Sequence, residues 1–239
     1  MSHSPEATRP VAFRIASRIP YALATARWFL AWRESHERNA KNITRKNTRR
    51  AYERVYRSDS LLAEYLVPAR LAFYEEVADK CARLGPRRAI DVGCGTGHLL
   101  RLLVDRMAKR PELIVGIDHS RAGIRRASAL VPEGRFLVAD LYQPPADLGR
   151  FDLVLCTEVL EHLREPTHAV EVLCGLSAPG GRIAITVPDG AQDSWEGHVN
   201  FWDEHELKAF LAPYGLRSID RIEDGGVFLA WLAPVAEDE

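Results

Sequence analysis

This chain of 239 residues has few cysteines, no long uninterrupted apolar run and almost no net charge. Its four cysteines form no Cys-x-x-Cys pair, which argues against a zinc site or a disulfide framework and favours a cytoplasmic location. The most apolar N-terminal stretch, residues 11–32, is broken by three arginines and a proline. It therefore predicts neither a transmembrane helix nor a secretory signal.

The net charge of −1 is the sum of two unlike regions. Residues 1–57 hold 13 Lys and Arg side chains against four Asp and Glu, so the remainder is acidic. Residues 11–57 have a helical, partly amphipathic pattern, with Tyr21, Trp28 and Trp32 near one stripe. We expect these aromatic side chains to dock the segment onto the main domain; a basic surface for nucleic acid or for a membrane is the alternative.

The rest of the chain predicts an α/β domain after a second helical stretch at residues 60–84, which Pro68 kinks or divides. From residue 85 onward, predicted strands alternate with predicted helices. The strands are 88–92, 113–117, 135–139, 151–156, 182–187, 216–222 and 227–232, and the helices are 98–109, 121–130, 166–176 and 203–211. Such alternation indicates a parallel sheet covered on both faces. Gly225-Gly226 predicts a final hairpin, hence an antiparallel strand at the edge. We divide the chain into a helical extension, 1–84, and a core, 85–239.

The first predicted strand leads into a glycine-rich turn, Asp91-Val-Gly-Cys-Gly-Thr-Gly97, followed by a helix. This arrangement gathers unpaired backbone N–H groups and a partial positive charge where a ligand can approach bare backbone. The next two strands end in Asp118 and Asp140. Carboxylates bind sugar hydroxyls or an adenine amino group but repel phosphates, and residues 91–100 contain no Lys or Arg. The pattern favours an adenosine ligand without phosphates.

These motifs, with Gly116-Ile-Asp118, Asp140-Leu141, Phe151-Asp-Leu-Val-Leu-Cys156 and Ala178-Pro-Gly-Gly181, resemble the class I S-adenosylmethionine-dependent methyltransferases over about residues 86–235. The resemblance implies a Rossmann-like α/β fold: a seven-stranded, mostly parallel sheet with an antiparallel edge strand. It also implies S-adenosylmethionine as cofactor. Its implied contacts are Asp91, Gly93, Gly95 and Gly97 at the methionine end, Asp118 at the ribose, and Asp140 with Leu141 at the adenine. Further candidates for cofactor binding are Cys94, Thr157 and His119, the last at the border of the adenosine. A nucleotide-binding fold with another ligand is the alternative.

A second polar group, Thr157-Glu158-Val-Leu-Glu161-His162, follows the fourth strand. If it forms a helical turn, Glu158, Glu161 and His162 share one face, and His198 from the loop after the fifth strand can join them. Two carboxylates and two imidazoles suit Mg²⁺ or another divalent cation, which could lower the pKa of a substrate hydroxyl. In an alternative without metal, the carboxylates contact the cofactor or cap the turn.

The motif is similar to that of two metal-dependent subgroups, the ubiquinone-biosynthesis O-methyltransferases and the small-RNA 3′-terminal 2′-O-methyltransferases; the sequence around His198 departs from the RNA subgroup. We therefore predict methyl transfer to a small-molecule hydroxyl, with His198 or His162 as general base or with a cation as activator. An RNA 2′-O-methyltransferase that uses the basic N-terminal region and a regulatory protein without catalysis are the alternatives. By analogy, the N-terminal helices should cover the acceptor pocket. Trp195 and Trp202 are candidates either for walls of that pocket or for packing.

Overall fold

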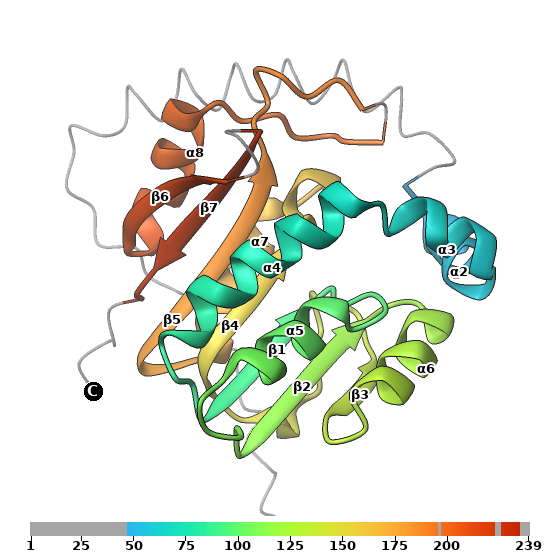
Figure 1. The fold of residues 1–239 in the computed structure, drawn as a ribbon. Coiled ribbons are helices and arrows are strands. Elements are labelled where there is room, and N and C mark those ends of the chain that lie inside the picture. Colours follow the sequence, from blue (N-terminus) through green and yellow to red (C-terminus); the bar gives the residue numbers. More distant parts are fainter. Residues whose placement is uncertain (1–46, 196, 223–225, 235–239) are drawn as a thin grey trace, which may run out of the picture.

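The computed structural model describes residues 47–195, 197–222 and 226–234. The predicted basic segment before residue 47, with Tyr21, Trp28 and Trp32, lies outside the described residues, as does Gly225. A seven-stranded sheet in the order β3-β2-β1-β4-β5-β7-β6 forms the centre of the molecule (Figure 1). Its strands are β1 (Arg88–Val92), β2 (Leu113–Asp118), β3 (Arg135–Val138), β4 (Phe151–Thr157), β5 (Ser177–Pro188), β6 (Leu216–Ile222) and β7 (Val227–Leu232).

The sheet is parallel from β3 to β5, and β7 pairs antiparallel with both β5 and β6. The predicted mostly parallel sheet with an antiparallel strand toward its edge is confirmed. The antiparallel strand lies one place in from the edge, because β6 takes the outermost position. Strand β5 begins earlier than predicted. Ser177 already pairs with Phe151, and the register shifts by a bulge before Arg182 pairs with Leu153.

Helices cover both faces of the sheet, as the alternating pattern predicts (Figure 1). One face packs against α4 (Pro68–Ala82), α5 (His98–Arg106) and α6 (Arg121–Leu130), and the other against α7 (Pro166–Leu176) and α8 (Glu204–Leu211). In β1, Ala89 belongs to the core between the sheet and α4, α5 and α6, whereas Ile90 and Val92 belong to the core between the sheet and α7 and α8. Successive side chains of a strand point to opposite faces, so one short apolar run serves both cores.

Local chemistry explains where several helices begin. Pro68 occupies the first turn of α4 and separates it from α3 (Asp59–Tyr65), which confirms that the proline divides the second helical stretch. Asp203 is the N-cap of α8 in a reciprocal capping box with Glu206, so this helix begins one residue later than predicted. Helix α2 (Arg49–Arg57) precedes α3 and packs on α6. Among the described residues, no helix is long and apolar enough to cross a bilayer.

Three short 3₁₀ helices complete the described secondary structure: η2 (Ala146–Leu148), η3 (Leu160–His162) and η4 (Ala212–Tyr214). The second of these lies directly after β4, at the same edge of the sheet as the glycine-rich turn. Because the carboxyl ends of parallel neighbouring strands meet at one edge, the fold brings the two predicted polar groups into one region.

Candidate active site at the carboxyl ends of the strands

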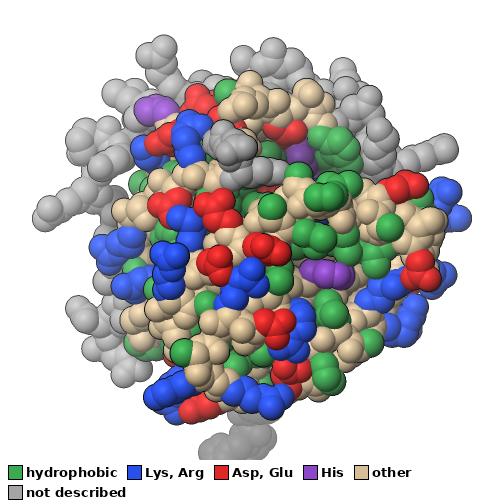
Figure 2. All heavy atoms as spheres, in the orientation of Figure 1, with side chains coloured by type: hydrophobic (Ala, Val, Ile, Leu, Met, Phe, Trp, Pro, Cys, Tyr) green, Lys and Arg blue, Asp and Glu red, His purple; other side chains and the backbone are tan. Residues whose placement is uncertain are grey.

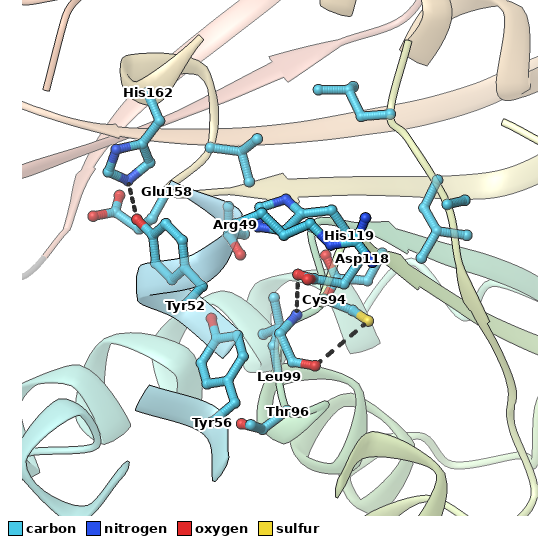
Figure 3. Close-up of a pocket in the computed structure, with 18 of the residues that line it drawn as sticks. Arg49, Tyr52, Tyr56, Cys94, Thr96, Leu99, Asp118, His119, Glu158 and His162 are labelled. Atoms are coloured by element: carbon cyan, nitrogen blue, oxygen red, sulfur yellow. Dashed lines mark hydrogen bonds between the residues drawn. The ribbon is translucent and has the colours of Figure 1, made fainter. Parts of the chain in front are cut away.

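A cavity of about 520 Å³ lies at the carboxyl ends of β1, β2 and β4 (Figure 3). Nine of the ten predicted cofactor residues line it: Asp91, Gly93, Cys94, Gly95, Asp118, His119, Asp140, Leu141 and Thr157. Gly97 is the exception, because it serves as the N-cap of α5 at the end of the turn. Five tyrosines that the sequence prediction did not include also line the cavity: Tyr52, Tyr56, Tyr65, Tyr74 and Tyr142.

The glycine-rich turn leaves bare backbone at the cavity wall. The N–H groups of Gly93 and Cys94 both donate to the Ile117 carbonyl oxygen, at 2.8 and 3.0 Å, and this tethers the turn to β2. Gly93 has φ +88°, and a Cβ there would lie 2.5 Å from Cγ2 of Val159. Gly97 has φ +80°, and its Cβ would lie 3.0 Å from the backbone of Ala127. Both positions therefore need glycine.

Two buried carboxylates form the acidic floor of the cavity. Asp118 accepts from the Gly95 N–H (3.0 Å) and from the Ser120 N–H (2.7 Å), and burial raises its pKa. Asp91 has one buried oxygen without a hydrogen-bond partner among the described residues. Burial and the nearby charge of Asp118 raise the pKa of Asp91 to about 8. A positively charged ligand group beside Asp91 would reverse that shift.

The predicted helical turn starting at Thr157 is wrong. Strand β4 extends through Thr157, Glu158 has φ +55°, and only Leu160–His162 forms a 3₁₀ turn. The Glu158 N–H donates to the Thr186 carbonyl (3.2 Å), and the Thr186 hydroxyl donates to the Glu158 carboxylate (3.2 Å). Because this single left-handed residue redirects the chain, Glu158 does not share a helical face with Glu161 and His162.

Glu161, His162 and His198 nevertheless meet, and we call them the Glu161–His162–His198 cluster. The Nε2 atoms of His162 and His198 lie 3.6 and 3.9 Å from Oε1 of Glu161. One potential ligand atom from each residue lies within 4.8 Å of the other two. Glu161 is completely buried, and neither carboxylate oxygen has a hydrogen-bond partner among the described residues.

The charges within the cluster follow from its burial. Desolvation, together with the negative charge of Glu158, raises the pKa of Glu161 well above its usual range. Desolvation, together with His198, lowers the pKa of His162 to about 3. In the protein alone, burial therefore favours the protonated form of the Glu161 carboxyl and the neutral form of the His162 ring. A neutral imidazole and a carboxyl that can release its proton are both able to bind a cation.

The loop after β5 positions the cluster, and the sequence prediction missed two of its residues. Asp193 accepts a hydrogen bond of 2.5 Å from Nδ1 of His198, which turns Nε2 of that ring toward Glu161. Asn200 donates to the carbonyls of Leu160 and Leu163, at 2.8 and 2.7 Å. No motif spacing marks either residue, because both contacts depend on how the loop folds back over η3.

The two tryptophans of this loop differ in role. Trp202 is buried and stacks on Phe210, with ring centroids 5.1 Å apart, so it is a packing residue. Trp195 is 39% exposed, and its ring meets those of His162 and His198 edge to face, at 5.5 and 4.7 Å. Trp195 thus supplies an aromatic wall beside the cluster.

Helix α2 and the residues before it close the opposite side. The hydroxyl of Tyr52 lies 3.2 Å from Nε2 of His162 (Figure 3), and the Asn47 amide donates to the His162 carbonyl at 3.0 Å. The Tyr52 ring also meets the His119 ring, with centroids 5.9 Å apart. One side chain therefore touches both the cofactor region and the cluster. The spacing of Tyr52 and Tyr56, four residues apart on a helix, was the available signal in the sequence.

The comparisons with known proteins agree with this geometry. The sequence model of the methyltransferase domain family matches residues 69–220. The chain belongs to the class I S-adenosylmethionine-dependent methyltransferases. An uncharacterized methyltransferase of Mycobacterium bovis is 30% identical over 193 residues, which cover 68% of this chain and 95% of that protein.

Two curated methyltransferases of stated activity match over shorter lengths. A ubiquinone biosynthesis O-methyltransferase of Alkalilimnicola ehrlichii is 38% identical over 126 residues, 50% of this chain and 47% of that protein. A trans-aconitate 2-methyltransferase of Delftia acidovorans is 34% identical over 110 residues, 45% of this chain and 40% of that protein. The chain thus spans less than half the length of these two relatives.

Among solved structures, the N-methyltransferase NodS of Bradyrhizobium japonicum in complex with S-adenosylhomocysteine superposes with a TM-score of 0.62. The alignment has 20% identity and covers 79% of this methyltransferase chain and 98% of NodS. At this identity the likeness shows the fold alone. The confirmed Rossmann-like architecture and the family membership therefore come from independent comparisons, one of structure and one of sequence.

Proposed function

We propose that this protein transfers the methyl group of S-adenosylmethionine to a hydroxyl of a small-molecule acceptor, with a divalent cation at the Glu161–His162–His198 cluster. The observation that carries the proposal is Glu161, a fully buried carboxyl without a hydrogen-bond partner among the described residues, which lies between two imidazoles, and one of these, that of His162, lines the cavity. A buried polar group of this kind is costly unless a ligand satisfies it.

The residues around the cavity fit the cofactor. The bare glycine turn admits the methionine portion close to the backbone, and the unpartnered oxygen of Asp91 suits its ammonium group. Asp118, His119, Asp140 and Leu141 line the same cavity, and we assign the ribose to Asp118, the adenine to Asp140 with Leu141, and the border of the adenosine to His119. The bound cofactor would supply the methyl group, and the protein would mainly align the two reactants and exclude water.

The donor set also fits a cation. One carboxylate oxygen and two imidazole nitrogens suit Mn²⁺, Fe²⁺, Co²⁺ or Zn²⁺ better than Mg²⁺, which prefers oxygen ligands. Asp193 holds the second nitrogen of His198, as outer carboxylates do for ligating histidines. When bound, a cation supplies Lewis acidity that lowers the pKa of the acceptor hydroxyl. Glu158 accepts a hydrogen bond from the Thr186 hydroxyl, and the proposed ligand set is Glu161, His162 and His198 without it.

A second mechanism uses the same residues without a cation. His198, backed by Asp193, has Nε2 directed toward the cluster and could remove the acceptor proton as a general base. The two mechanisms respond differently to chelation. Dialysis against a chelator followed by Mn²⁺ or Co²⁺ should abolish and then restore radiolabelled methyl transfer if the cation is required. Unchanged activity after chelation would leave the general-base mechanism.

The assignment of the cluster to the acceptor side has its own test. His198→Ala should abolish turnover while leaving the affinity for S-adenosylhomocysteine nearly unchanged in calorimetry. Loss of cofactor affinity in this variant would contradict the assignment. The RNA alternative rests mainly on residues 1–46, outside the described part of the chain. The RNA function predicts an affinity for RNA that falls steeply as the salt concentration rises, whereas the small-molecule function predicts no affinity for RNA.

A further inference from the structure

Helix α2 is fastened over the cavity by contacts with α6. The Ser120 hydroxyl and the Ala122 N–H donate to the Glu53 carboxylate, at 2.6 and 3.0 Å. From the same helix, Arg126 donates to the carbonyl of Tyr56 at 2.5 Å. Figure 2 shows basic and acidic side chains interspersed over this side of the molecule, where α2 and α6 lie. These contacts fix the position from which Tyr52 reaches the cluster.

The hydrogen bond between Tyr52 and His162 uses the nitrogen that a cation would need. Nε2 of His162 lies 3.2 Å from the Tyr52 hydroxyl and 3.6 Å from the Glu161 carboxylate. A ring nitrogen that accepts the hydroxyl proton has its only lone pair engaged. In the other tautomer Nε2 carries the proton and donates to Tyr52, so it has no lone pair to offer. In both cases a cation at Nε2 requires this hydrogen bond to break.

We propose that Tyr52 gates the cluster: its phenol occupies the His162 nitrogen in the ligand-free protein, and the cation binds only after this phenol is released. The inference rests on the proposed function, because it assumes a cation at the cluster. Tyr52 also meets the ring of His119 beside Asp118. The gate therefore lies between the cofactor region and the acceptor region.

The structure offers a matched pair of variants. Tyr52→Phe removes the hydroxyl that holds His162 and keeps the ring. Tyr142→Phe removes another phenol hydroxyl from the same cavity, one that donates to the Glu165 carbonyl and not to the cluster. The full-length protein is stripped of metal and titrated with Co²⁺ by calorimetry. The thermal unfolding midpoint serves as the control for folding of both variants, because both side chains line the cofactor cavity.

Tyr52→Phe should bind Co²⁺ about fivefold more tightly than the wild type, because one neutral hydrogen bond no longer competes. Tyr142→Phe should match the wild type. The visible absorption spectrum of bound Co²⁺ should be the same in all three proteins, since the gating phenol is not itself a ligand.

Any result other than tighter Co²⁺ binding by Tyr52→Phe contradicts the proposal that Tyr52 gates the cluster. Weaker binding and an altered spectrum in Tyr52→Phe would make Tyr52 a ligand, and unchanged affinity would show that its hydrogen bond does not compete. If the wild type binds Co²⁺ and Tyr52→Phe binds it equally, only the gate fails. If neither protein binds Co²⁺, the cation in the proposed function fails as well.

Discussion

The two ends of the cavity differ in how far their polar groups are satisfied. At the cofactor end, both oxygens of Asp118 accept backbone hydrogen bonds, and the glycine turn is tied to Ile117. At the acceptor end, both oxygens of Glu161 and Nδ1 of His162 are buried without hydrogen-bond partners among the described residues. The cofactor end is thus largely formed before its ligand arrives, although Oδ1 of Asp91 has no hydrogen-bond partner among the described residues, whereas the acceptor end retains a whole carboxyl group that only a ligand can satisfy. Variants at the two ends should therefore have separable effects.

The largest expected effect is at Glu161. Glu161→Gln keeps the shape of the side chain but cannot become a carboxylate. We expect turnover to fall by about 10²- to 10⁴-fold and the affinity for S-adenosylhomocysteine to stay within about twofold of the wild type, by calorimetry. The control is Glu171→Gln, an exposed position on α7. An equal loss of cofactor affinity would break the distinction between the two ends.

A smaller effect is expected at Asp193, which orients a ring of the cluster without belonging to it. Asp193→Asn leaves His198 in place but weakens its preference for one ring orientation. Removing such an outer partner should lower Co²⁺ affinity by about 10- to 100-fold, again with cofactor binding retained. If Co²⁺ binding is unchanged, Asp193 only packs the loop.

At the cofactor end, Asp91 should make ligand binding depend on pH. Its pKa of about 8 means that it must lose a proton to meet the cofactor ammonium. Affinity for S-adenosylhomocysteine should therefore rise with pH up to about 8 in the wild type, whereas Asp91→Asn should bind about tenfold more weakly at pH 8, with a flat profile. A pH-dependent profile in Asp91→Asn would assign the effect to another group.

The same residue predicts a change in stability. The folded protein holds the Asp91 proton up to about pH 8, while the unfolded chain releases it near its ordinary value of 3.8. The contribution of Asp91 to the free energy of unfolding therefore falls as pH rises between these values. Asp91→Asn should raise the thermal midpoint more at pH 8 than at pH 4. Equal changes at both pH values would contradict the raised pKa.

The smallest expected effect is at Glu53, outside both ends. Its hydrogen bonds with Ser120 and Ala122 at the start of α6 lower its pKa to about 2. Glu53→Gln should cost about 1 kcal/mol of unfolding free energy at pH 7, measured by urea denaturation. The difference should be complete above the unfolded value of 4.5 and disappear as pH falls toward 2. A difference that persists at pH 2 would point to packing.

Much of the fold could be predicted because its signals are local. The predicted bounds of α6, α7, β6 and β7 match the structure, since apolar periodicity and turn residues mark their ends. The glycine turn and the acids at the tips of the next two strands were also readable, because parallel strands bring their carboxyl ends together. The predicted division into a helical extension, 1–84, and a core, 85–239, stays a prediction. Helix α4, from the predicted extension, packs in the same hydrophobic core as β1, from the predicted core domain.

The errors and omissions in the candidate site have a different origin. Glu158 was misplaced because one residue at positive φ interrupts a pattern that reads as a helical turn. Tyr52 and Asp193 were missed because their partners are chosen by folding. Tyr52 lies 110 positions from His162 in the chain, and Asp193 reaches His198 only through the shape of its loop.

The amino-acid sequence alone determined the parallel sheet, the bare glycine turn and the family, because each depends on residue types at short, regular spacings. The tertiary structure decided which side chains share the acceptor site: it brought Glu161, His162 and His198 together, excluded Glu158 from their face and placed Tyr52 against His162. Spacing along a strand or helix sets a direction for each side chain. Contact between distant segments depends on how those segments pack, which no local pattern encodes.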